Sequence, residues 1–232
     1  MKLSVFRMSI PQTLLVLGLS MGLAVGSGSV SASGGGGGGG IASAPVDSRP
    51  SSPEQQAEAD YKKGLKHKER AWKLEQKAET AKNEKRKAKD MKRAAKEYRK
   101  AQDLFAEVLR NFPEHYKAAN ELGYVLRKQG NYEQAIGSYN YALQLYPDFL
   151  QAVEYRAEAF VSIGFYDEAR DAYMRLFRED AELAEELMVS MRAWAEQQES
   201  PGARARNFIE WLDSRKNIDA FGELTESKSS GW

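Results

Sequence analysis

Cysteine is absent from the 232-residue chain, which excludes disulfides, thiolate zinc sites, a cysteine nucleophile and a lipid-modified N-terminal cysteine. Histidine is scarce: His67 and His115 are far apart in sequence and belong to no metal motif. The seven consecutive glycines at residues 34–40 lack the Lys-Ser/Thr ending of a phosphate loop, and no nucleophile elbow occurs. The sequence therefore predicts neither an enzyme nor a bound cofactor or metal.

Long apolar runs are missing too, except for one near the N-terminus. Residues 13–26 form an apolar run of 14 residues after a basic start, shorter than the ~20 residues of a membrane span. Small residues follow it, with Val30 and Ala32 at the −3 and −1 positions of a signal-peptidase site. We expect residues 1–32 to be a cleaved signal peptide and the mature chain to be periplasmic or secreted. An uncleaved signal would leave the chain anchored in a membrane.

Beyond the signal, a tether and a helical region follow. Residues 33–53 are rich in Gly, Ser and Pro, and we expect them to be a flexible linker. From there to about Lys216 the periodicity is helical, without a convincing strand. Four chain-breaking residues recur at one constant interval: Pro113, Gly130, Pro147 and Gly164. Two such intervals make about 34 residues, the period of a repeat built from two helices.

One such unit, residues 116–149, shows the pattern most clearly. Its small, apolar and breaking residues are Ala119, Leu122, Gly123, Leu126, Ala135, Tyr139, Ala142 and Pro147. Small residues on one helix face let two antiparallel helices approach closely, while Tyr139 fills the gap beside them. This pattern resembles the tetratricopeptide repeat, with Ala119 and Leu126 in place of the usual aromatics. The resemblance implies an all-α tetratricopeptide-repeat solenoid that binds proteins and catalyses no reaction.

The flanking units follow the pattern less strictly. Residues 150–183 repeat it, but in the preceding unit residues 82–95 are mostly Lys, Arg and Ala. The segment YKKGL, residues 61–65, looks like the start of a repeat, but it stands too early in the chain for the period. We predict an insertion that lengthens both helices of the first unit into a basic hairpin with Asn83 near its tip. A single uninterrupted helix over residues 54–111 is the alternative.

The last apolar residues predict a cap on the repeats. Leu183, Leu187, Met191 and Trp194 recur at helical spacing, and a further short helix follows. Stacked repeats expose an apolar end face that needs such a cover. The predicted order of segments is a signal peptide (1–32), a linker (33–53), a repeat domain of about three units (54–181), a helical cap (182–217) and a disordered tail (218–232).

The resemblance also implies a binding site, because the first helix of each unit in this family lines a concave groove. Carried onto this chain, the groove positions are Lys117, Asn120, Tyr124, Arg127, Gln151, Glu154, Tyr155 and Glu158. Tyrosines flanked by charged and amide groups suit an extended or helical peptide. Glu154 and Glu158 stand where cations would help bind a terminal carboxylate, so that clamp is not reproduced. An ordinary solvated helix face is the alternative interpretation of the row.

Charge is unevenly distributed although the whole chain is nearly neutral at +1. Residues 62–100 carry 17 Lys/Arg against 6 Asp/Glu, a net of +11, whereas residues 101–200 carry 9 against 18, a net of −9. We predict a protein-binding scaffold or adaptor in a cell envelope. The alternative is a polyanion or membrane-surface binder acting through the basic hairpin 62–100. Self-association and a merely solvated hairpin stay open, and few aromatics make nucleic acid a poor partner.

Overall fold

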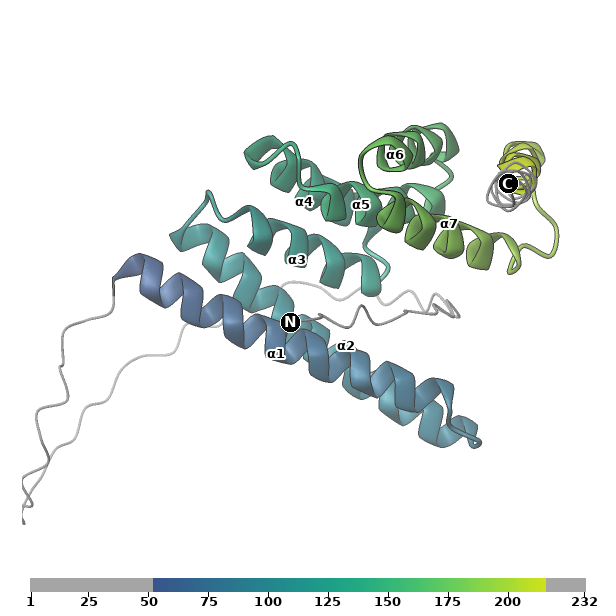
Figure 1. Ribbon diagram of the computed structural model, residues 1–232. Helices are drawn as coiled ribbons and strands as arrows, with labels where there is room; N and C mark the ends of the chain where they lie inside the picture. The colour runs from purple at the N-terminus through teal and green to yellow at the C-terminus, as the bar shows by residue number, and fades with distance from the viewer. Residues whose placement is uncertain (1–51, 216–232) are drawn as a thin grey trace, which may run out of the picture.

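The structure is a computed structural model that describes residues 52–215 (Figure 1). The predicted signal peptide and tail, and nearly all of the predicted linker, lie outside these residues. Within them the chain is helical and contains no strand. The labelled helices are α1 (Pro53–Glu79), α2 (Glu84–Asn111), α3 (Tyr116–Lys128), α4 (Tyr132–Leu145), α5 (Leu150–Ser162), α6 (Tyr166–Glu179) and α7 (Ala181–Ala195), and a further helical segment covers 203–215. The all-α fold is confirmed.

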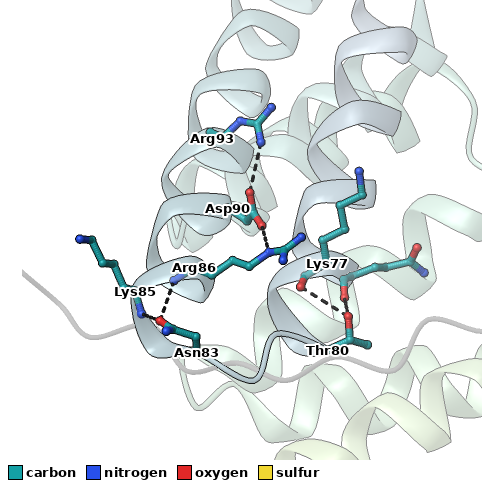
Figure 2. A network of polar contacts seen from close by, with 8 residues as sticks. Lys77, Thr80, Asn83, Lys85, Arg86, Asp90 and Arg93 are labelled. Atoms are coloured by element: carbon teal, nitrogen blue, oxygen red, sulfur yellow. Dashed lines mark hydrogen bonds and ion pairs between the residues drawn. The ribbon is translucent and has the colours of Figure 1, made fainter.

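The helices α1 and α2 form a long antiparallel hairpin rather than one continuous helix. The polar side chains of the tip satisfy the backbone groups that a sharp turn frees (Figure 2). Thr80 Oγ1 donates to the carbonyl of residue 76 at the end of α1. The side-chain oxygen of Asn83 accepts from the N–H groups of Lys85 and Arg86, as an N-cap does. In Figure 1 the hairpin extends well beyond the end of α3.

The same close contact, between a glycine of the first helix and an aromatic ring of the second, occurs in the hairpin and in the next unit, and it identifies the hairpin as an enlarged repeat. A Cβ added to Gly123 would lie 2.6 Å from the ring of Tyr139, so α3 and α4 approach through a glycine. A Cβ added to Gly64 of α1 would meet the ring of Phe105 of α2 at 2.5 Å. Phe105 precedes Tyr139 by one repeat, whereas Gly64 precedes Gly123 by much more than one repeat. The additional residues between Gly64 and Phe105 therefore form the outer part of the hairpin.

A second contact recurs with the same period. Tyr141 of α4 donates its hydroxyl proton to the carbonyl of Pro113, 3.1 Å away. One repeat later, Arg175 of α6 donates to the carbonyl of Pro147 at 3.0 Å. Each contact ties the second helix of a unit to the turn that precedes the unit. The repeat is thus visible in polar contacts as well as in the core.

The helices form two layers with different spacing. The first helices of successive units, α1, α3, α5 and α7, contact their neighbours along the chain of repeats (Figure 1). The second helices α2, α4 and α6 make no such contacts with one another among residues 52–215. The first-helix layer is therefore the closer-spaced, concave side of the solenoid. None of the helices in this described region combines the length and the hydrophobicity that a membrane span requires.

The C-terminal end carries the capping helices that the sequence predicted. The helix α7 packs on both α5 and α6. Phe208 and Leu212, from the segment that follows α7, are fully buried in one core with Leu176 and Met188. The guanidinium of Arg170 lies 5.6 Å from the Phe208 ring centroid and adds a cation–π contact. The last two helices thus occupy the place of one more repeat and cover the apolar end of the unit formed by α5 and α6.

Candidate peptide-binding groove

The predicted groove residues lie on α3 and α5, neighbouring helices of the concave layer. Lys117 and Gln151, near the N-terminal ends of these helices, are exposed. Deeper in the row Asn120 is 1% exposed and Arg127 and Glu154 are each 3% exposed. This inner part is therefore buried, unlike an ordinary solvated face. Its role in peptide binding stays a prediction.

Aromatic rings surround the central cation. The guanidinium of Arg127 lies 5.5 Å from the ring centroids of both Tyr124 and Tyr155. The two rings are 5.4 Å apart, and the side-chain amide of Gln151 donates to the Tyr155 hydroxyl at 3.2 Å. From α1, the ammonium of Lys68 lies 4.8 Å from the Tyr124 centroid. The middle of the row is thus a largely buried cluster of aromatic rings and cations.

Two carboxylates share one buried cation. Arg127 forms an ion pair with Glu158 between α3 and α5. Glu154 lies one turn before Glu158 on the same helix. Burial, together with the negative charge of Glu158, raises the pKa of the Glu154 carboxyl well above its usual 4.5. The ion pair of Arg127 and Glu158 therefore links two repeats. Glu154 holds a proton more readily than an ordinary glutamic acid.

Several buried polar atoms of the groove have no hydrogen-bond partner within residues 52–215. Both the oxygen and the nitrogen of the Asn120 side chain belong to this set, as does one carboxyl oxygen of Glu154. Most buried polar groups in proteins have a partner, and a missing one costs about 1–3 kcal/mol. Asn120 thus holds a donor and an acceptor without partners just beneath the groove wall.

The hairpin contributes residues to this face that the sequence prediction missed. Lys68 of α1 donates to Glu121 of α3, and Lys128 of α3 lies 2.8 Å from the carboxylate of Glu75. The same carboxylate accepts the hydroxyl proton of Tyr98 at 2.8 Å. Counting back by one repeat could not find Lys68, because the insertion shifts the count. Aligning Gly64 with its counterpart in α3 would have placed Lys68 where Arg127 stands.

The groove continues toward α7, which the sequence prediction assigned only to the cap. A small pocket of about 20 Å³ lies beside Arg127 and Glu158 and is also lined by Val161, Ser190 and Trp194. Its volume suits about one water molecule. Val161 stands one repeat after Arg127, and a further repeat along the chain leads to the C-terminal end of α7. Continuing the count would therefore have drawn attention to this helix.

The two histidines have structural contacts. His115 is the N-cap residue of α3, and its Nδ1 accepts from the backbone N–H of Ala118 at 3.1 Å. His67 Nδ1 lies 2.7 Å from a carboxylate oxygen of Glu97. No group of three or more His, Asp or Glu side chains in the described part of the chain is placed to hold a metal ion.

Comparisons with known proteins find similarity to part of the chain. The family model of the tetratricopeptide repeat matches residues 92–148 and 120–184. Similar solved structures include the first TPR of Spaghetti (RPAP3) bound to HSP90 peptide SRMEEVD, which is 17% identical over 65% of this chain and 95% of that chain with a TM-score of 0.35. Another is the TPR2B-domain:pHsp70 complex of yeast Sti1, 16% identical over 67% of this chain and 98% of that one, with a TM-score of 0.36. No curated protein matches the chain. The tetratricopeptide-repeat model thus matches residues 92–184, which lie within the all-α solenoid that the described residues form.

Proposed function

We propose that this chain is a non-enzymatic scaffold or adaptor that binds a peptide or a protein segment in the groove of α3 and α5. The observation that carries the proposal is the Asn120 side chain, which is 1% exposed and has no hydrogen-bond partner among the described residues. Its donor and acceptor match the C=O and N–H of a peptide backbone. A small shift of the groove wall would expose the Asn120 side chain, and a bound peptide would then satisfy both atoms.

The groove also suits a peptide in its charge. Lys117, Lys68 and Arg127 supply cations, while Glu154, Glu158 and Glu121 supply carboxylates, so neither sign dominates. The ring of Tyr155 is half-buried against the ring of Tyr124, and its remaining exposed part offers apolar contact area to a ligand. We infer a segment that binds through backbone hydrogen bonds and an apolar or aromatic anchor, with little dependence on its net charge.

The cell envelope is the proposed place of action. Support for it comes from the sequence alone: the apolar run of residues 13–26 and the small residues at 30 and 32 match a signal peptide. Fractionating cells that express the chain with a C-terminal tag tests this proposal. A tagged product shortened by about the length of residues 1–32 and found outside the cytoplasm supports export, whereas full-length product in the cytoplasm contradicts it.

A selection of displayed random peptides against the chain tests the binding function. The strongest peptide is then titrated by fluorescence anisotropy against wild type, Asn120→Leu and the exposed control Asn207→Leu. Asn120→Leu removes both polar atoms but keeps a branched side chain of similar shape. We expect at least about tenfold weaker binding for Asn120→Leu, because two hydrogen bonds to the peptide are lost, and no change for Asn207→Leu.

Two results would contradict the proposal. One is a selection that enriches no peptide. The other is a peptide whose affinity is the same for wild type and Asn120→Leu, since it would bind elsewhere on the molecule. Raising the salt concentration separates the groove from the basic hairpin, because binding dominated by exposed charges weakens with salt far more than binding through backbone hydrogen bonds.

A further inference from the structure

The hairpin carries a basic groove on the face that points away from α3. The groove holds about 480 Å³ and its cations come from both helices: Arg70, Lys73 and Lys77 of α1, and Arg93, Lys96 and Lys100 of α2. Leu74 and Glu97 complete the lining. The side-chain amide of Gln129, just beyond the end of α3, donates to Gln102 of α2. Gln102 comes two positions after Lys100, and residues two apart on a helix face opposite sides, so the basic groove lies on the side of the hairpin away from α3. This is the end face of the solenoid, where a preceding repeat would pack.

A cover of polar residues is expected on a terminal repeat, but so large an excess of positive charge is not. Charged residues of both signs would keep the end face soluble. Like charges three or four positions apart on a helix instead repel one another. Lys73 pairs with Glu69, Arg93 with Asp90 and Lys100 with Glu97. Arg70, Lys77 and Lys96 form no ion pair within residues 52–215, so half of the groove's cations have no direct carboxylate partner there.

The opposite end of the solenoid presents a complementary helix face. In α7 the residues Ala184, Leu187, Met188 and Met191 are buried against the preceding unit. The other side of the helix exposes Glu182, Glu185, Val189 and Glu196. Val189 is 43% exposed, one of the few large apolar side chains on the surface. The stripe thus has acidic residues on both sides of an apolar residue.

We propose that the α7 face of one molecule docks in the basic groove of a second copy, so that copies associate head to tail. The basic groove places Leu74 between cations, and α7 places Val189 between glutamates. Arg70 and Leu74 are four positions apart, as are Glu185 and Val189, so one cation and one apolar side chain can meet one carboxylate and one apolar side chain over about 6 Å of helix. The two ends of the association are different surfaces, so it extends into a ring or a filament rather than stopping at a dimer.

The occupant follows from charge complementarity within the chain itself. The hairpin segment 62–100 has a net charge of +11 and residues 101–200 a net charge of −9, so a neighbouring copy brings the required acidic surface. Glu97 does not oppose docking, because it already accepts from Lys100 and lies 2.7 Å from His67 Nδ1. The docking residues of α1, α2 and α7 are different from the proposed peptide-binding residues of α3 and α5, so the proposal does not rest on peptide binding.

Charge reversal of each surface tests the proposal with the full chain. The groove variant is Arg70→Glu/Lys77→Glu/Lys96→Glu, and the α7 variant is Glu182→Lys/Glu185→Lys/Glu196→Lys. The matched control is Lys85→Glu/Lys92→Glu/Arg99→Glu, which reverses three exposed cations of α2 outside the basic groove and makes the same change in net charge. Sedimentation velocity at low and high salt measures association, with inorganic polyphosphate as an added probe.

Wild type and the control variant are expected to associate at low salt and to dissociate as salt screens the charges. Each of the two surface variants should associate about tenfold more weakly or not at all, because its two surfaces then carry the same sign. Mixing the two variants should restore association, since the acidic α7 of the groove variant meets the unchanged basic groove of the other. Recovery on mixing cannot arise from misfolding.

Two results would overturn the proposal. The first is a wild type that stays monomeric at low salt; if it also binds polyphosphate and the groove variant does not, the groove is assigned to a polyanion. The second is a control variant that loses association as strongly as the groove variant, which would make the effect one of net charge alone.

Discussion

Replacing Asn120 with leucine should stabilise the protein although it alters the predicted binding site. The Asn120 side chain is 1% exposed, and neither of its polar atoms has a hydrogen-bond partner within residues 52–215. Each unsatisfied buried polar atom costs about 1–3 kcal/mol. Leucine has the same branching but larger terminal groups, and the added volume offsets about 1 kcal/mol or more of the gain. Relief of the two atoms, taken in the lower to middle part of that range, gives about 2–4 kcal/mol, and an offset of about 1–2 kcal/mol leaves a net gain of about 1–2 kcal/mol in the free energy of unfolding.

The gain is measurable as a melting temperature followed by far-UV circular dichroism. For a folded region of this size, about 1–2 kcal/mol corresponds to a rise of about 2–8 °C. Asn207→Leu is the control, because Asn207 is exposed and a substitution there should change stability by no more than about 0.5 kcal/mol. A lower melting temperature for Asn120→Leu, with the control unchanged, would refute the reasoning, since it would mean that the folded protein satisfies this amide.

Three further predictions concern the repeat interface and the buried charges. Gly123→Ala should lower the free energy of unfolding by about 1–3 kcal/mol, because its Cβ would lie 2.6 Å from a fully buried ring. The Cβ of Gly137→Ala meets nothing within 4 Å, so this control should raise the free energy of unfolding by about 0.5–1 kcal/mol. Equal effects of the two variants in urea unfolding would contradict this contrast. Arg127→Met should lower the free energy of unfolding by about 3–5 kcal/mol, because it leaves buried carboxylates without their cation. Adding Glu158→Met should recover much of this loss. A double variant no more stable than Arg127→Met alone would argue against the ion pair. Because the pKa of Glu154 is raised, its bound proton stabilises the fold below pH 4.5, and this stability is lost as the pH rises toward the folded-state pKa. Glu154→Gln should therefore flatten the dependence of the melting temperature on pH in that range. An unchanged profile would refute the shift.

The buried charges connect this stability to the groove. Arg127 contacts the rings of Tyr124 and Tyr155 and pairs with Glu158, so it holds the first helices of two repeats together and shapes the groove floor at once. Breaking the pair should therefore change both stability and peptide affinity. Asn120→Leu differs in kind, because it is expected to change these two properties in opposite directions.

The sequence alone determined the repeat and its local consequences. The spacing of Pro113, Gly130, Pro147 and Gly164 indicated the period, and at Gly130 and Gly164 the backbone adopts a φ of +80°, which glycine tolerates best. The early repeat start at residues 61–65 also led to the hairpin. These features are local in sequence: each depends on which residues a helix or turn accepts, and the same local rule acts in every unit.

Only the tertiary structure decided what the groove is made of. The sequence placed Tyr124 and Arg127 in a row of groove positions, but it did not show that they are buried or that Arg127 pairs with Glu158. It also missed Lys68, because the insertion in the first unit separates sequence distance from spatial distance. Burial and pairing depend on side chains that meet across different helices, and the periodicity of one helix carries no information about which residue of its neighbour it will face.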